Sequence, residues 1–387
     1  MNFDYTDEQQ LLADSLRRFV DKAYDFEARR RIVASSEGYS REAWMQFAEL
    51  GLLGLPLPLD IGGFGGSALD LLPVMEVMGE ALVVEPYLAT VGMASRFITL
   101  GGTPEQKKNV LPAIAAGTLT MAFAHTERNS RYDLAHVTLQ ARKSADGYRL
   151  EGEKCVVLGA PSAHMLVVSA RTAGHERDVA GISLFLIDAA TPGVAMRRYR
   201  TLDGLRAADI VFRDALVPAD SLAGKEGEAL SLIEEVVDYA TALVCAEALG
   251  AIKYANDATL EYLKTREQFG APIGSFQALQ HRMVDMLISY EQARSMAILA
   301  CATVDTQSDP QRRKRVISAA KIKIADACRH VSQESVQLHG GMGMSDELKL
   351  SHTFRRLTMI AQQFGDVDHH LERFAEMQGD GSPAPRE

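Results

Sequence analysis

One arginine stands in a setting that suits phosphate binding. Arg266 is followed by Glu267, Gln268, Phe269 and a glycine. Its guanidinium group is planar and permanently charged, so it can grip two oxygens of a pyrophosphate at once. The competing interpretation is a surface ion pair with Glu261 or Glu267, and this segment taken by itself favours the ion pair.

A second segment, Gln337-Leu-His-Gly340-Gly341-Met-Gly343, offers an amide and open backbone to a ligand. The amide of Gln337 can donate and accept hydrogen bonds. Gly340 and Gly341 lack side chains, so a ligand can approach their main chain closely. The same glycines can close a helix as its C-cap, and both interpretations can hold together.

Signatures of several other chemistries are missing from the sequence. It contains no G-x-S-x-G, no P-loop and no H-E-x-x-H. The glycines within 62–66 do not lie between a strand and a helix, as a dinucleotide-binding fingerprint requires. His369 and His370 are flanked by Asp366 and Asp368, but adjacent histidines on a helix point about 100° apart, so we predict no metal site. Two other histidines are expected to be interior residues: His125 and His339.

The composition is that of a globular chain with an acidic surface. The 387 residues are 47% hydrophobic and carry a net charge of −10, which argues against a phosphate-backbone partner. Four cysteines, none in a C-x-x-C pair, predict buried thiols in a reducing compartment. The chain shows no targeting signal and no apolar stretch of membrane-spanning length, so a cytoplasmic location is expected.

The positions of these residues depend on three segments of different character. Residues 1–117 read as helices: Thr6 and Gln9 form a capping box, Ser40 precedes a second helix, and Pro104 begins another. Residues 118–225 favour short strands, and Asp146-Gly147 predicts a hairpin turn between 137–142 and 148–150. We read this segment as a small antiparallel β domain.

The third segment, 226–378, returns to long helices. Helical patterns run over 229–265, from Ser275, from Asp309-Pro310 to Gly340, and near 368–377. Four helices with apolar stripes and short connections predict an antiparallel four-helix bundle. Residues 379–387 are expected to be a disordered tail.

Several motifs together resemble the acyl-CoA dehydrogenase family. Arg266-Glu-Gln-Phe269-Gly resembles the family's Arg-x-x-Phe-Gly, and Gln337-x-x-Gly340-Gly341 resembles its Gln-x-x-Gly-Gly-x-Gly. Leu52–Gly66 and Phe123–Glu127 resemble two further family segments, and the order of helical, β and helical segments is also the family's.

The resemblance implies the acyl-CoA dehydrogenase fold and α,β-dehydrogenation of an acyl-CoA with FAD, an oxidoreductase reaction on CH–CH bonds of fatty acid β-oxidation. It implies an electron-transferring flavoprotein as acceptor and a tetramer whose subunits reach across to a neighbour's FAD. It implies these FAD contacts: Arg266, Gln268, Phe269, Gln277, Gln337, Gly340, Gly341 and Thr126.

The chain departs from the family where the catalytic base belongs. The family's Glu before Gly falls on Phe364, and the alternative Glu position on the preceding long helix falls on Ala240. Neither residue can accept a proton. The family's flavin-facing aromatic falls on Val156 and its hydroxyl on Leu158, so Thr126 alone remains of the polar ring contacts.

These losses predict a base-lacking subunit of a heteromeric enzyme, which lends FAD contacts to a related partner. Ser130–Leu134 and Phe364–Leu371 resemble the small subunit of pimeloyl-CoA-type dehydrogenases. One alternative is a self-sufficient homomer with a displaced base, Asp366, although an N-cap role for this residue is the competing reading. Another alternative is a non-enzymatic member that binds nucleic acid or acts as a scaffold, against which the acidity argues.

Overall fold

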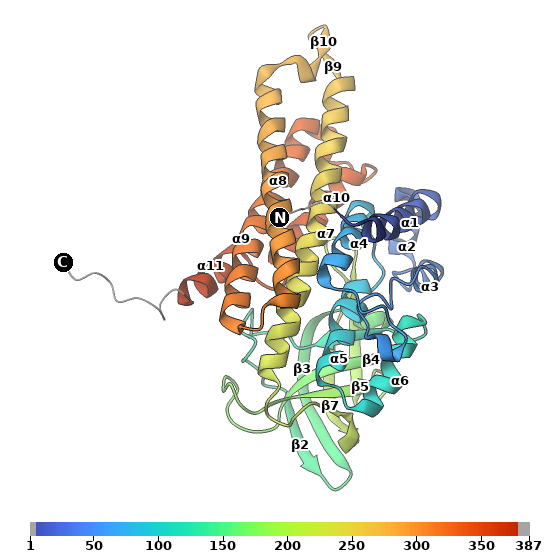
Figure 1. The fold of residues 1–387 in the computed structure, drawn as a ribbon, viewed down its shortest axis with the longest axis vertical. Coiled ribbons are helices and arrows are strands. Elements are labelled where there is room, and N and C mark those ends of the chain that lie inside the picture. Colours follow the sequence, from blue (N-terminus) through green and yellow to red (C-terminus); the bar gives the residue numbers. More distant parts are fainter. Residues whose placement is uncertain (1–4, 378–387) are drawn as a thin grey trace, which may run out of the picture. The chain divides into compact units, whose positions relative to one another are not determined.

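The N-terminal helices begin where their capping residues predict. In the computed structural model, which describes residues 5–377, Thr6 Oγ1 accepts from the Gln9 N–H and Gln9 Oε1 accepts from the Thr6 N–H, at 3.2 and 3.0 Å (Figure 1). Ser40 likewise caps α3. The helices are α1 (Asp7–Ala23), α2 (Phe26–Ala34), α3 (Arg41–Glu49), α4 (Ala68–Ala81), α5 (Ser95–Gly101) and α6 (Pro104–Ala115), with the π-helical turn η2 (Leu88–Ala94).

The middle of the chain forms the predicted β domain, in which most neighbouring strands pair antiparallel, but β4 pairs in parallel with β1 and β2. The strands are β1 (Met121–Ala124), β2 (Gln140–Ser144), β3 (Gly147–Leu158), β4 (Met165–Arg171), β5 (Ile182–Asp188), β6 (Val194–Arg200), β7 (Arg206–Val217) and β8 (Leu222–Ala223). Their order is β6-β7-β3-β2-β4-β5-β8, and β1 joins β4 in parallel. Parallel pairing joins strands distant in sequence, which alternation within one strand does not reveal.

The predicted hairpin exists, but its turn lies one residue earlier than expected. Ser144 pairs with Gly147, so the two turn residues are Ala145 and Asp146, and β2 begins at Gln140. Gly147 adopts a φ of 134° and the carbonyl of Val217 lies where a Cβ would stand. Glycine at this position is therefore needed for close strand approach, and not for the turn itself.

The C-terminal segment contains five helices in the described part of the chain, so the four-helix prediction missed one. They are α7 (Leu230–Thr265), α8 (Gln277–Thr306), α9 (Pro310–His339), α10 (Lys349–Gln362) and α11 (Val367–Glu376). Asp309 caps α9 as predicted. The missed helix, α10, has no side-chain N-cap bond, so its start carried no recognisable signal.

By contacts the chain divides into two compact units that interleave along the sequence. One holds the described residues of 1–26, 68–83 and 241–387, and the other holds 27–67 and 84–240. In the second unit, the sheet encloses a core that includes Leu150, Val168, Phe185 and Phe212. The three-segment division by sequence stays a prediction, and the predicted tail 379–387 lies outside the described residues. No helix among residues 5–377 has the length and apolar character needed to cross a bilayer.

Candidate functional site

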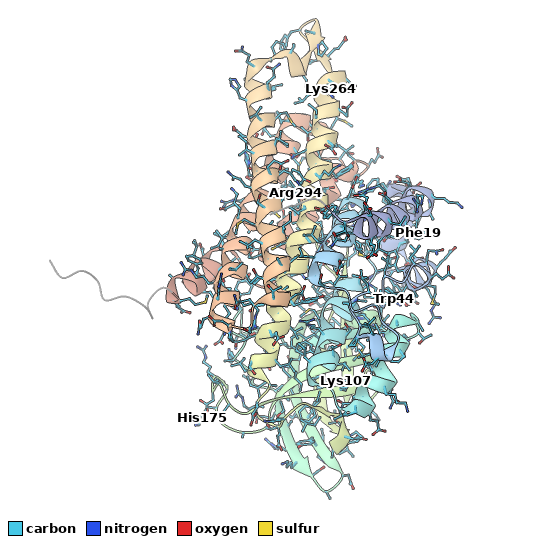
Figure 2. All side chains as sticks on the ribbon, in the orientation of Figure 1. Phe19, Trp44, Lys107, His175, Lys264 and Arg294 are labelled. Carbon is cyan, nitrogen blue, oxygen red and sulfur yellow. The ribbon has the colours of Figure 1, made fainter. Side chains whose placement is uncertain are left out.

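The Arg266 segment forms the tip of the hairpin between α7 and α8 (Figure 1). Figure 2 places Lys264 near the same end of α7. Two short strands, β9 (Glu267–Gln268) and β10 (Ala271–Pro272), pair around Phe269 and Gly270, which both have positive φ. Phe269 is 95% exposed. The ring of Phe276 meets it edge-on with centroids 6.2 Å apart and covers little of it, which favours burial of Phe269 against another molecule.

Arg266 has no ion pair in the part of the chain that the structure describes. Glu261, which was considered as its ion-pair partner, binds Lys264 instead, at 2.8 Å. The backbone of Arg266 is fixed by its N–H to the Tyr262 carbonyl (2.8 Å) and by its carbonyl, which accepts from Ile273 N–H (2.8 Å). The guanidinium group is therefore exposed on a fixed backbone and uncommitted. Two further predicted residues, Gln268 and Gln277, are also exposed.

The glycine segment ends α9 and leaves open space beside Gly340 and Gly341. Gly340 donates its N–H to the carbonyl of Gln337, so the C-cap interpretation holds. A Cβ added at Gly340 or Gly341 would meet no atom within 4 Å. The same glycines therefore end the helix and leave room for a ligand beside exposed Gln337.

One aromatic contact brings the two motifs together. Tyr262, one turn before Arg266, stacks on His339, which precedes Gly340; the ring centroids lie 4.3 Å apart and the planes 22° apart. His339 is buried and its Nδ1 lies 2.8 Å from the Ser335 carbonyl. Burial lowers the pKa of His339, which keeps the stacked ring neutral. Spacing along the sequence did not reveal this contact.

The turn at the first expected base position is held without a carboxylate. Phe364 has a φ of 61°. Buried Lys321 donates from Nζ to the carbonyls of Gly365 (2.7 Å) and Ala361 (3.1 Å). Burial lowers the pKa of Lys321, and the two carbonyl dipoles still face its ammonium group. The second expected position, Ala240, is fully buried.

Asp366, the fallback base, caps α11. Its Oδ1 accepts from the His369 N–H at 2.9 Å. His370 is buried, its Nδ1 lies 3.2 Å from Ser318 Oγ, and burial lowers its pKa to about 2. Residues 5–377 contain no cluster of three or more His, Cys, Asp or Glu residues that could hold a metal.

A buried carboxylate that the sequence analysis did not single out lies on α7. Glu247 binds Arg356 of α10 through both oxygens, with Nε–Oε1 at 2.6 Å and Nη2–Oε2 at 2.7 Å. Glu247 lies seven positions after Ala240, which is about two helical turns, so both lie on one face of the helix. Because both oxygens are committed to a buried guanidinium, Glu247 is a poor general base.

A polar network lies inside the β domain, beneath the predicted flavin-facing segment. Lys154 Nζ donates to Glu127 Oε1 (2.7 Å), Ser169 Oγ (3.1 Å) and the His125 carbonyl (3.1 Å). Burial lowers the pKa of Lys154 to about 8, against the opposing effect of Glu127. His125 is buried as predicted, and burial lowers its pKa to about 3. Glu127 also accepts from Thr138 and Leu139, so the network fixes the segment after β1 that carries Thr126.

The side chains at the predicted ring-facing positions have few hydrogen-bonding groups. Thr126 is exposed, Val156 is 48% exposed and Leu158 is half-buried. Neither Val156 nor Leu158 can donate a hydrogen bond from its side chain. This surface does not fit the ring contacts that the family resemblance implied, whereas Arg266 and the open glycines fit a pyrophosphate.

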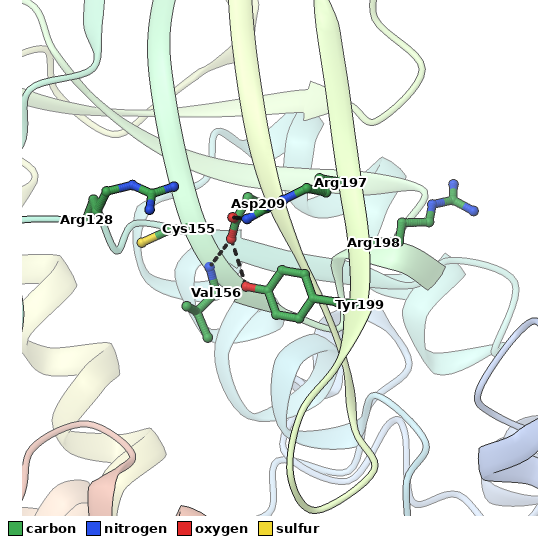
Figure 3. Close-up of a pocket in the computed structure, with 7 residues that line it drawn as sticks. All are labelled: Arg128, Cys155, Val156, Arg197, Arg198, Tyr199 and Asp209. Carbon is green, nitrogen blue, oxygen red and sulfur yellow. Dashed lines mark hydrogen bonds and ion pairs between the residues drawn. The ribbon is translucent and has the colours of Figure 1, made fainter.

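Beside Val156 lies an open groove of about 550 Å³ (Figure 3). Asp209 Oδ1 accepts from Tyr199 Oη (2.7 Å) and the Val156 N–H (3.1 Å), and its Oδ2 binds Arg197 (2.6 Å). Burial would raise the pKa of Asp209, but these three donors hold it below its usual range. The remaining lining residues are Arg128, Arg198 and Cys155. Cys155 is only half-buried, which corrects the prediction that all four thiols are buried.

Known proteins match the chain over almost its full length. Family models match residues 6–118 (acyl-CoA dehydrogenase, N-terminal domain), 122–215 (middle domain) and 230–377 (C-terminal domain). A probable acyl-CoA dehydrogenase YngJ of Bacillus subtilis is 30% identical over 378 residues, which cover 96% of this chain and 98% of that protein.

Solved structures with the same fold include a two-protein assembly and an FAD complex. The ChsE4-ChsE5 complex of Mycobacterium tuberculosis contains a chain with a TM-score of 0.88 and 26% identity, covering 99% of this chain and 100% of that one. The FAD complex of PigA has a TM-score of 0.89 and 27% identity, covering 98% and 99%. The chain therefore belongs to the acyl-CoA dehydrogenase family, whose members are FAD-dependent oxidoreductases acting on CH–CH bonds.

Proposed function

We propose that this chain is the base-lacking subunit of a heteromeric acyl-CoA dehydrogenase and lends FAD contacts to a related subunit. The observation that carries the proposal is the hairpin tip, where uncommitted Arg266 stands beside 95% exposed Phe269. Both side chains are exposed, so both are available to another molecule. The expected base positions, Phe364 and Ala240, offer no proton acceptor.

The residues of the tip suit the anionic part of FAD. Arg266 would clamp the pyrophosphate with two N–H donors, and the open main chain at Gly341 would let the cofactor approach. Gln337 would hydrogen-bond the cofactor, and Phe269 would cover its apolar surface. Bound FAD supplies the acceptor for the hydride that leaves the acyl chain.

Removal of the proton in this reaction needs a carboxylate, and the chain has none at the expected base positions. α,β-Dehydrogenation removes a proton from Cα of the acyl-CoA while a hydride leaves Cβ. Lys321 fixes the turn around Phe364, and Asp366 is engaged in capping α11. A displaced aspartate base is thus disfavoured, and a Glu-bearing partner subunit would remove the proton.

The helical surface offers apolar residues for such a partner. Val284, Leu287 and Ile288 recur at helical spacing on α8 and are each about half exposed. Burying such a stripe against another helix is strongly favourable. We expect a dimer of dimers, in which electrons pass from FAD to an electron-transferring flavoprotein.

The test is Arg266→Ala in the co-expressed complex with a Glu-bearing acyl-CoA dehydrogenase subunit. Losing a bidentate charged contact should weaken FAD binding about tenfold or more, since such bonds contribute about 1.5–3 kcal/mol. FAD bound per complex is measured from absorbance after dialysis and by titration of the apo-complex.

The matched control is Arg329→Ala, which removes an exposed arginine of α9 that pairs with Asp326 one turn away. FAD occupancy should remain that of the wild type in this variant. Unchanged occupancy in Arg266→Ala would remove the main cofactor assignment.

A further inference from the structure

The connecting segment, residues 340–348, joins α9 to α10 and carries the open glycines, and both of its ends contact tyrosines of α7. Tyr262 stacks on His339, which immediately precedes the segment, with ring centroids 4.3 Å apart. Lys349, which immediately follows the segment, places its Nζ over the ring of Tyr254, 4.0 Å from the centroid. The segment is therefore joined to one helix at both of its ends.

The two tyrosines lie on one side of α7. They are eight positions apart, so both belong to the stripe that one face of a helix presents. At 1.5 Å per residue, they stand about 12 Å apart along the helix axis. Tyr254 is half-buried, and burial raises its pKa to about 12, so Lys349 faces a neutral phenol ring. Such a ring attracts a cation through its electron-rich face.

The contact at the first end also reaches the arginine of the hairpin tip. The Tyr262 carbonyl accepts the Arg266 N–H at 2.8 Å. His339 is buried, and its Nδ1 lies 2.8 Å from the Ser335 carbonyl, which fixes the imidazole ring. A Cβ added at Gly343 would stand 3.2 Å from the His339 Cβ, so the connecting segment folds back closely on the end of α9. Tyr262 thus contacts Arg266 through its backbone and the connecting segment through its ring and His339.

The contact at the second end holds a helix start that lacks a side-chain cap. α10 begins at Lys349, and the preceding Leu348 makes no capping bond. A cation in the first turn of a helix is disfavoured by the helix dipole, so this position calls for a compensating contact. The ring of Tyr254 supplies one. Arg355 of α10 donates from Nη2 to Asp346 Oδ1 at 2.7 Å, so α10 is also joined to the connecting segment.

A segment rich in glycine needs such contacts if it is to be ordered before a ligand arrives. Residues 340, 341 and 343 are glycines, and glycine loses more conformational freedom on ordering than any other residue. A ligand that meets a disordered segment must offset that loss, whereas a segment already held in place binds more tightly. Met342 and Met344 are 59% and 67% exposed, so these two side chains do little to hold the segment.

We propose that Tyr254 and Tyr262 are positioning residues that clamp the connecting segment to α7 and so hold its glycines in a fixed position relative to Arg266. The inference rests on the proposed function, in which these glycines and Arg266 contact FAD. Neither tyrosine has to touch the cofactor, because Tyr262 acts through His339 and Tyr254 acts through Lys349.

The first measurement is amide hydrogen exchange of the full chain alone, followed by mass spectrometry of peptides that cover residues 340–348. Tyr262→Leu and Tyr254→Leu should each make this segment exchange about threefold to tenfold faster, the change expected when one aromatic or cation–π contact is lost. Tyr262→Phe and Tyr254→Phe keep the rings and should stay within about twofold of the wild type. This measurement needs neither FAD nor a partner subunit.

The second measurement is FAD titration of the apo-complex formed with the co-expressed Glu-bearing subunit. Both leucine variants should weaken FAD binding about threefold to tenfold, because the cofactor then has to order the segment, and both phenylalanine variants should restore it. The matched control is Tyr290→Leu, which changes a half-buried tyrosine of α8 and should leave both measurements within about twofold of the wild type. Thermal melting verifies the fold, and Lys349→Gln removes the second contact from its other side if Tyr254→Leu does not fold.

Unchanged exchange in both leucine variants would overturn the clamp. Faster exchange with unchanged FAD affinity would overturn the positioning role, and the proposed function would stand if Arg266→Ala still weakens FAD binding. Equal effects in Tyr290→Leu would also overturn the proposal, since they would show a general loosening of the helices. Unchanged FAD affinity in Arg266→Ala would instead reject the proposed function, and this inference with it.

Discussion

Several buried charged side chains are hydrogen-bonded to specific partners, so they are not available to bind a ligand. Lys321 is committed to two main-chain carbonyls, Glu247 to Arg356, and Lys154 to Glu127. Removing one member of such a buried pair is costly because the other charge is left unpaired. These residues therefore shape the turns and strands of the site, whereas Arg266 is uncommitted and available to a ligand.

The network around His125 gives the protein a defined acid sensitivity. Burial, aided by Lys154, lowers the pKa of His125 to about 3, so the folded ring stays neutral. The unfolded ring takes a proton near its ordinary value of about 6.5. As pH falls from about 6.5 towards 3, the unfolded state gains a proton that the folded state excludes. The unfolding free energy should then fall by about 1.4 kcal/mol per pH unit for this group.

His125→Gln should make this decline shallower, because the amide does not titrate. Urea unfolding at several pH values between 4.5 and 6.5 measures the slope for each variant. His175→Gln, which changes an exposed loop histidine (Figure 2), is the control and should keep the wild-type slope. A wild-type slope in His125→Gln would show that this ring does not stay neutral in the folded protein.

Among the elements, those with local start and stop signals could be predicted from the sequence. The capping residues Thr6, Ser40 and Asp309 each begin a helix as expected. The parallel pairing of β1 with β4 and the uncapped helix α10 could not be predicted, because their evidence lies in contacts between distant segments.

In the candidate site, too, local motifs could be predicted from the sequence, whereas contacts between distant segments could not. The sequence places Arg266 and Gly340 in two motifs, but only the stacking of Tyr262 on His339 brings the motifs together. The carbonyl contacts of Lys321 around Phe364 also join residues 40 and 44 positions apart, so no local pattern could reveal them.

Substitutions at the tip of the hairpin between α7 and α8 should have little effect on the stability of the dissociated chain. Phe269 is 95% exposed, so Phe269→Ser should alter the unfolding free energy of the dissociated chain by less than about 0.5 kcal/mol. The same substitution should weaken assembly with the partner subunit, because an exposed aromatic ring suits an interface anchor.

Urea unfolding of the chain alone and sedimentation of the complex measure the two effects separately. Leu371→Ser, which changes another half-exposed apolar residue outside the tip, is the control and should leave assembly unchanged. A loss of stability without a change in assembly would mean that Phe269 acts within its own chain.

At the scale of the whole molecule, the family fold is retained while the expected base positions are changed. The family models cover the chain from residue 6 to 377 with short gaps, yet neither expected base position holds a carboxylate. The sequence could show this because the losses fall at defined motif positions. We infer that the chain has kept the residues that would bind a neighbour's FAD and has lost those that would contact its own flavin ring.

The most direct test of this account is the flavin content per chain after expression alone and repurification with added FAD. Absorbance gives FAD per polypeptide, and anaerobic addition of an acyl-CoA reports reduction as bleaching. We expect colourless or substoichiometric protein that does not bleach, with flavin and bleaching gained on co-expression with a Glu-bearing subunit. One FAD per chain with bleaching in the protein alone would contradict it, and Asp366→Asn would then test that residue as the base.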